Sequence, residues 1–206
     1  MKMKRLTASL VLAAGLWAVM FAPCMAAYVD FWAMMTLSAM GLAGLASWFN
    51  PGWWRALRFG PTQWLWGIGL AVALWAVFWV GDKVSAWLLS FARTQVDSIY
   101  GMKTGEQAWV LTVLMLFLIG PAEEIFWRGY VQRTLADRFS PNAGYVLATL
   151  LYAGVHAPSC NFMLLMAAAV AGAVWGLFYR LLPGHLTALI VSHALWDVAV
   201  FIWFPI

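Results

Sequence analysis

The feature that most constrains this chain is its succession of long apolar runs, which follow one another from the first residues to the last. Apolar residues make up 65% of the 206 residues and charged residues only 10%, whereas soluble domains carry roughly 25% charged residues. One water-soluble core cannot hide so large an apolar excess, so the chain must place helices in a membrane. We therefore predict an all-α polytopic transmembrane bundle of about 7–8 membrane helices.

The apolar runs divide into segments that each approach the roughly 20 residues a helix needs to cross the hydrocarbon. The expected spans are 6–28, 31–49, 62–81, 107–128, 142–157, 160–182 and 185–204. The fifth is short and is expected to be tilted or partly sunken, and the fourth should continue to about Phe139 as an amphipathic extension. Residues 83–99 have mixed polarity and predict an interfacial helix or an eighth, weakly hydrophobic membrane segment. No linker or repeat divides the chain, so residues 1–206 are expected to form a single integral membrane domain.

The N-terminal segment has two interpretations. Its basic head, apolar stretch and small residues at the end are typical of a signal peptide. We favour a first transmembrane helix that is retained, because the apolar run is long and a second span follows at once. The two cysteines, Cys24 and Cys160, make no CxxC pattern and no zinc framework, and we interpret them as small packing residues.

Lysine and arginine are shared unevenly between the two sides of the predicted bundle, which sets its orientation. One side receives Lys2, Lys4, Arg5, Arg55, Arg58, Arg128, Arg133, Arg138 and Arg180, and the other receives Lys83, Arg93 and Lys103. The N-terminus is therefore predicted to be cytoplasmic and the C-terminus to lie on the far side. The net charge of +4 does not indicate a nucleic-acid partner, because these residues sit between apolar spans.

Ionisable groups within membrane helices are costly and mark function by default, and here they gather in three motifs. The motifs read EEIFWR at 123–128, YAGVH at 152–156 and HALWD at 193–197. Each contains a pair at i,i+4, the spacing that puts two side chains on one helical face. In the first motif we expect Glu124 to pair with Arg128 as structural support. Glu123 is turned roughly 100° away from Glu124 and is expected to face the bundle interior as the catalytic residue.

The depth of these residues along their helices supports a single site. With cytoplasmic edges taken near 139, 142 and 184, Glu123 lies ~24 Å from its edge, His156 ~21 Å, His193 ~14 Å and Asp197 ~20 Å. Three helices thus bring polar groups to similar depth, which predicts an intramembrane polar cavity. Pro121 lacks a backbone donor, and predicts either a kink that opens the helix beside the carboxylates or a tolerated transmembrane proline.

This set of side chains suits the activation of water. A glutamate in a low-dielectric cavity can accept a proton near neutral pH, and a neutral histidine can share that work or polarise a carbonyl. Glu123, His156 and His193 also make a His₂Glu set of the kind found in catalytic zinc sites. The residue types are compatible with both metal-free and metal-assisted hydrolysis, and no cofactor other than a divalent metal such as zinc is predicted.

The three motifs, in this order and on separate helices, resemble those of the CPBP intramembrane proteases, the CAAX prenyl endopeptidase and bacteriocin-processing (Abi) group. The resemblance covers Glu123 to Asp197. It implies a helical bundle with a conical cavity and hydrolysis of a peptide bond near the terminus of a membrane-associated protein or peptide. It also implies that Glu123 and His156 activate the water and that His193 and Asp197 stabilise the oxyanion. Members are described both as glutamate-type proteases and as metalloproteases.

The sequence departs from this pattern at Asp197, which stands where asparagine is common. An ionised carboxylate cannot donate to an oxyanion. Asp197 is therefore either protonated by burial, or orients His193, or ligates a metal.

Two other functions fit the same polar cluster. A non-catalytic immunity or scaffold protein could use it to hold the bundle together, and a proton-coupled carrier could use it as a relay. We favour the endopeptidase, a hydrolase of the bacterial inner (plasma) membrane that acts on a membrane-associated protein or peptide within the lipid bilayer.

Overall fold

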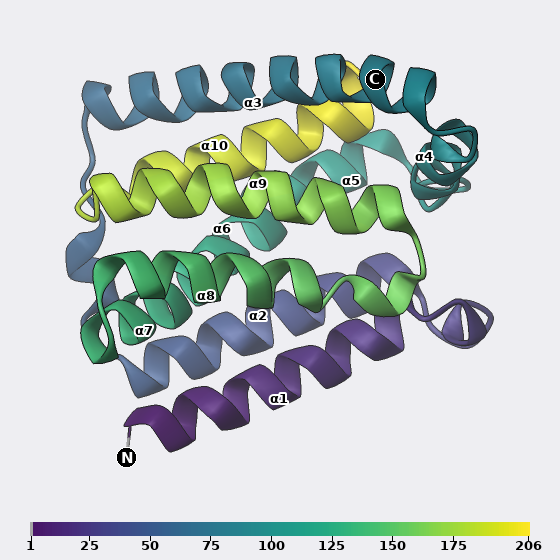
Figure 1. Ribbon diagram of the computed structural model, residues 1–206. Helices are drawn as coiled ribbons and strands as arrows, with labels where there is room; N and C mark the ends of the chain where they lie inside the picture. The colour runs from purple at the N-terminus through teal and green to yellow at the C-terminus, as the bar shows by residue number, and fades with distance from the viewer. Residues whose placement is uncertain (1) are drawn as a thin grey trace.

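The computed structural model describes residues 2–206 as a bundle of helices that lie side by side (Figure 1). Within this range, six helical stretches are long and apolar enough to cross a membrane, and there is no strand. The six are α1 (Lys2–Phe21), α2 (Phe31–Phe49), α3 (Pro61–Leu88), the continuous helix Ala108–Arg138, α9 (Phe162–Leu181), and Leu186–Trp203, which begins with α10 (Leu186–Val198). The predicted all-α membrane bundle is confirmed.

The fifth expected span differs from the others. It forms α8 (Pro141–Gly154), whose 14 residues extend about 21 Å, short of the roughly 30 Å of hydrocarbon. Ser140 begins the helix by accepting a hydrogen bond from the Ala143 N–H at 3.1 Å. Six helices therefore meet the length of a span, rather than the seven expected, and α8 packs between α7 (Arg133–Arg138) and α9.

The mixed-polarity segment 83–99 is divided between two helices. Its first residues extend α3 as far as Leu88, and the rest belongs to α4 (Ala92–Gly101), a separate helix of 10 residues. Figure 1 shows α4 at the end of the bundle opposite the N-terminus. Cys24 and Cys160 are both exposed free thiols, so their interpretation as packing residues is wrong.

The helix that carries the two glutamates runs to Arg138, which confirms the expected extension. It contains α5 (Ala108–Leu114), α6 (Gly120–Glu124) and α7. Wider π-helical turns, Met115–Ile119 and Ile125–Gln132, flank α6 on both sides. Such turns are frequent at functional sites. They accommodate Pro121 within a continuous helix, in place of the open break that its ring would favour.

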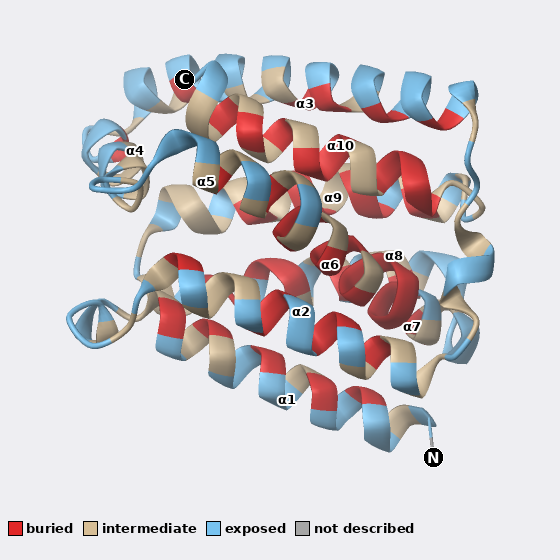
Figure 2. Cartoon of the chain, turned by 180° about the vertical axis from the view of Figure 1, so that it is seen from behind, coloured by how far each residue is buried: buried red, intermediate tan, exposed pale blue. Residues whose placement is uncertain are grey.

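Close approaches between helices place α6 and its neighbours at the centre of the molecule. A Cβ at Gly120 would lie 2.9 Å from the Ala194 Cα of α10, and one at Gly172 would lie 2.9 Å from the Tyr152 Cδ1 of α8. Glycine permits these contacts without a shift of the neighbouring atoms, and small residues at such positions let two helices approach closely. Figure 2 shows α6 and much of α10 buried, while α3 presents an exposed face.

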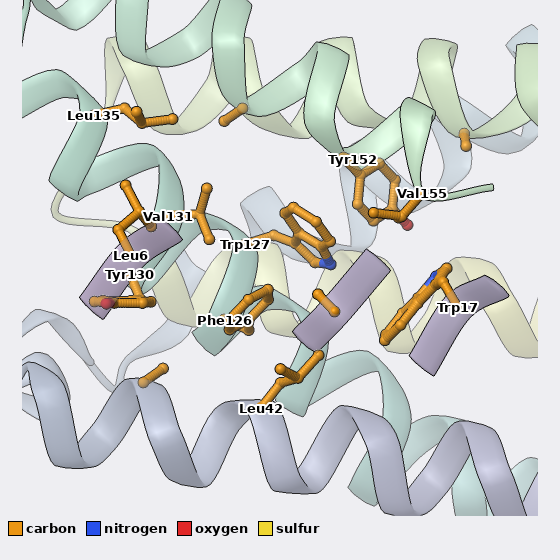
Figure 3. Close-up of a cluster of buried hydrophobic side chains, with 14 of the residues drawn as sticks. Leu6, Trp17, Leu42, Phe126, Trp127, Tyr130, Val131, Leu135, Tyr152 and Val155 are labelled. Carbon is orange, nitrogen blue, oxygen red and sulfur yellow. The ribbon is translucent and has the colours of Figure 1, made fainter. Parts of the chain in front are cut away.

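An aromatic cluster fills the space between α1, the glutamate helix and α8. Trp17 and Trp127 meet edge to face with ring centroids 6.5 Å apart, and Trp127 meets Tyr152 in the same way at 5.3 Å. Figure 3 shows these rings in one cluster with Phe126 and Leu42. Trp17 and Trp127 are almost fully buried, so this packing fixes the helices that flank the polar motifs.

Candidate active site

A cavity of about 460 Å³ inside the bundle brings the three motifs together. Glu123, His156, His193 and Asp197, the four residues predicted to be catalytic, all line it, together with Tyr152. The rest of its wall is largely apolar and comes mainly from α3 and α9, with smaller contributions from α2 and α4. The cavity therefore extends from the polar residues towards the end of the bundle at which α4 lies.

Glu123 offers this cavity a carboxylate oxygen that the protein leaves free. The residue is only 3% exposed, and its Oε2 atom is buried without a hydrogen-bond partner among residues 2–206. Burying an unsatisfied carboxylate oxygen is costly. This oxygen is therefore positioned to bind a water molecule or a substrate group in the cavity.

His156 presents a free ring nitrogen at the same site. Because α8 ends here, the His156 backbone N–H bonds to the Ala153 carbonyl (3.0 Å), and the Tyr152 carbonyl instead meets the His156 side chain at Nδ1 (2.8 Å). A carbonyl only accepts, so Nδ1 carries the proton and Nε2 is left as an acceptor. The Phe21 ring packs against this imidazole with centroids 5.2 Å apart.

Glu124 does not line the cavity. Its side chain bonds to Arg128 of the same helix and to His193 of α10. Its Oε1 accepts a hydrogen bond from Arg128 Nη1 at 2.7 Å and another from His193 Nδ1 at 2.7 Å. The pairing with Arg128 follows from their spacing, whereas the bond to His193 of α10 had no signal in the sequence. Arg128 Nη2 also donates to the Gly172 carbonyl at 3.4 Å. Glu124 is fully buried, and both donors bond to Oε1 and offset its charge, while Oε2 has no hydrogen-bond partner among residues 2–206.

His193 is fixed on two sides. Its ring stacks on Trp175, with centroids 3.9 Å apart and planes at 22°, and its Nδ1 donates to Glu124. The other nitrogen, Nε2, lies 3.6 Å from Asp197 Oδ2, beyond ordinary hydrogen-bonding distance. Glu124, rather than Asp197, is therefore the residue that orients this imidazole.

The number of protons that His193 and Asp197 hold decides whether they can donate a hydrogen bond to a substrate. The proton on Nδ1 is committed to Glu124, so the pair can donate to a substrate oxygen only when it holds one more proton. That proton sits either on His193 Nε2 or on Asp197. In both arrangements the pair has one N–H or O–H that it can donate.

The zinc alternative was tested against the arrangement of the donor atoms. Among residues 2–206, no group of three or more His, Cys, Asp or Glu side chains is placed to hold a metal ion. Glu123, His156 and His193 line one cavity, and Nδ1 of each histidine is engaged in a hydrogen bond, which leaves Nε2 as the ring nitrogen that could bind an ion. Binding of one zinc ion by all three would therefore require these side chains to move closer together.

Fold and site together define an integral membrane protein whose polar site is enclosed in a helical bundle. Residues 105–199 match the family model described as Rce1-like, type II CAAX prenyl endopeptidase Rce1-like. The matched region contains all three motifs and confirms the resemblance to the CPBP intramembrane proteases. No curated protein and no solved structure matches the chain.

Proposed function

We propose that this protein is an intramembrane endopeptidase that hydrolyses a peptide bond near the terminus of a membrane-associated protein or peptide. The observation that carries this proposal is the unpaired, buried carboxylate oxygen of Glu123 in a cavity shared with His156, His193 and Asp197. The family match over residues 105–199 supports protease chemistry.

In the proposed reaction, Glu123 and His156 hold a water molecule between the carboxylate and the free Nε2. Glu123 takes one proton from the water as the water oxygen attacks the scissile carbonyl carbon. The carbonyl oxygen becomes an oxyanion and accepts the hydrogen bond that His193 or Asp197 donates. The carbonyl then re-forms, the C–N bond breaks, and the proton held by Glu123 passes to the departing amine.

Glu124 and Arg128 serve as positioning residues in this scheme. Glu124 fixes the ring and the tautomer of His193 through the bond to Nδ1, and Arg128 holds Glu124 in place. Neither lines the cavity, so neither is expected to touch the substrate. The largely apolar wall receives the membrane-embedded part of the substrate and keeps bulk water from the reacting bond.

The proposed location is the bacterial inner membrane, with the N-terminus cytoplasmic. Figure 1 shows the two termini at opposite ends of the bundle. Basic residues of the expected cytoplasmic set, Lys2, Arg5, Arg133 and Arg138, gather around one pocket at the N-terminal end. This grouping supports the proposed orientation.

The test compares membranes from cells that produce the wild-type protein with membranes from cells that produce Glu123→Gln. Mass spectrometry of protein termini should find a membrane protein that is shortened only with the wild type, and the purified wild-type enzyme should cleave it. Loss of general base catalysis should slow cleavage by about 10²–10⁴-fold. Glu106→Gln is the matched control, because Glu106 is exposed and lies outside the cavity.

If Glu123→Gln cleaves as fast as the wild type, Glu123 does not activate the water. If both proteins fold and no terminus differs, the polar cluster serves the bundle as a scaffold and the endopeptidase proposal is wrong. Proton-linked uptake into vesicles by the wild type would instead identify a carrier.

A further inference from the structure

A second pocket, of about 200 Å³, lies at the end of the bundle where α1 begins and shares no lining residue with the catalytic cavity. Four basic side chains line it, together with one acidic side chain. These are Lys2, Arg5, Arg133, Arg138 and Asp137. With four positive charges against one negative charge, the lining carries a formal charge of +3.

These basic side chains are available to a ligand. Among residues 2–206, none of the four forms an ion pair with an acidic side chain, Asp137 included. Two of the guanidinium groups rest on aromatic rings, Arg5 on Phe49 at 5.2 Å and Arg138 on Phe139 at 5.4 Å. Such stacking orders the side chains and leaves their N–H groups free to bind an anion.

Tyr130 adds a buried donor to the pocket. The residue is 4% exposed, lines the pocket, and its hydroxyl has no hydrogen-bond partner among residues 2–206. The neighbouring Ser9 hydroxyl donates to the Arg5 carbonyl at 3.0 Å, and its oxygen can still accept, so Ser9 and a ligand in the pocket are the two acceptors open to Tyr130. Figure 3 shows the Tyr130 ring beside Leu6, with its oxygen directed away from Phe126 and Trp127. A buried hydroxyl without a partner is costly, and an acceptor in the pocket would satisfy it.

We infer that this pocket binds a phosphate group at the membrane surface. The planar guanidinium of arginine matches phosphate oxygens in pairs, and the Tyr130 hydroxyl supplies a neutral donor. Basic residues that only obey the charge asymmetry of membrane loops need neither a pocket nor a buried donor. The phosphate belongs either to an anionic lipid headgroup or to a soluble phosphate compound. A bound phosphate would join α1 to the helix that carries Glu123.

The experiment uses the purified full-length protein in a neutral detergent. Isothermal titration calorimetry compares three probes, which are short-chain phosphatidylglycerol, short-chain phosphatidylcholine and inorganic phosphate. The lipid probes differ in headgroup charge, because choline neutralises the phosphate. We expect phosphatidylglycerol to bind more tightly than phosphatidylcholine. Binding of inorganic phosphate as well would identify a site open to soluble phosphates, and its absence would identify a lipid site.

Substitutions locate the binding. Arg5→Gln and Arg133→Gln should each weaken binding about tenfold, and Tyr130→Phe by several-fold to about tenfold, as expected for lost hydrogen bonds to a charged ligand. Lys4→Gln is the matched control, because it removes the same charge one residue from Arg5 but outside the pocket lining. Arg138→Gln replaces any variant that circular dichroism shows to be unfolded.

Two results would overturn the inference. In one, the protein does not bind inorganic phosphate, and it binds phosphatidylglycerol no more tightly than phosphatidylcholine. In the other, Lys4→Gln weakens binding as much as Arg5→Gln, which would indicate diffuse attraction to surface charge.

Discussion

Replacement of Arg128 by methionine tests the buried ion pair beside the cavity. The change leaves Glu124 fully buried, with His193 as its one remaining donor among the bonds described. Removing one partner of a buried pair costs about 3–5 kcal/mol, because an uncompensated charge stays behind. The contact of Arg128 with the Gly172 carbonyl is long, at 3.4 Å, and should add little. Methionine also retains contact with the neighbouring aromatic rings, so we expect a loss of about 3–5 kcal/mol.

The assay is equilibrium unfolding in mixed micelles, applied to Arg128→Met, Glu124→Gln and the variant that carries both changes. Glutamine keeps a carbonyl that can accept from His193 and buries no charge. The double variant should therefore lose less stability than Arg128→Met alone, with a coupling of about 0.5–3 kcal/mol between the two positions. A loss below about 1 kcal/mol for Arg128→Met, the size seen for exposed pairs, would refute this reasoning. Strict additivity of the two changes would refute it as well.

Three further predictions concern the site and its surroundings. Asp197→Asn should keep cleaving at high pH, where the wild type loses activity, because an amide N–H donates without the extra proton that Asp197 and His193 must hold. Asp197→Leu should be slower than the wild type by about 10²–10³-fold, and pH–rate profiles of both variants check this. Gly172→Ala should destabilise the bundle by about 1–3 kcal/mol in the unfolding assay, since its Cβ would lie 2.9 Å from Tyr152 Cδ1, whereas Gly154→Ala, with nothing within 4 Å, should change stability little. Chelation should leave the cleavage rate unchanged, because the cavity side chains do not converge as metal ligands; a loss of activity that zinc restores would show the opposite.

The sequence predicts relations within one helix well. The pair of Glu124 and Arg128 follows from the i,i+4 spacing, and it is present at 2.7 Å. Depth along the helices also brought Glu123, His156 and Asp197 to one level, and all three line one cavity. Both arguments use only the fixed rise and rotation of a helix.

Relations between helices could not be read in the same way. The bond from His193 to Glu124 depends on the separation and rotation of α10 against α6, which Gly120 sets by its approach to Ala194. Likewise, the free ring nitrogen of His156 depends on where α8 ends. A hydropathy pattern records burial, but it does not record which buried faces meet.

The two adjacent glutamates differ in what surrounds them, and this difference argues for function. Glu124 is bonded to a guanidinium and an imidazole, as a buried carboxylate requires for stability. Glu123 is nearly as buried but lines the cavity, which Glu124 does not. Each glutamate has an Oε2 without a hydrogen-bond partner among residues 2–206, and the one on Glu123 belongs to the residue that meets the cavity. A scaffold would gain nothing from that arrangement, because an apolar side chain of similar size would pack there without the desolvation cost. The proposed hydrolase does gain from it, because the unsatisfied oxygen would bind the water that must be deprotonated. In the proposed enzyme, stability and catalysis are divided between neighbouring residues, and the rotation of about 100° per residue along a helix keeps the two environments apart.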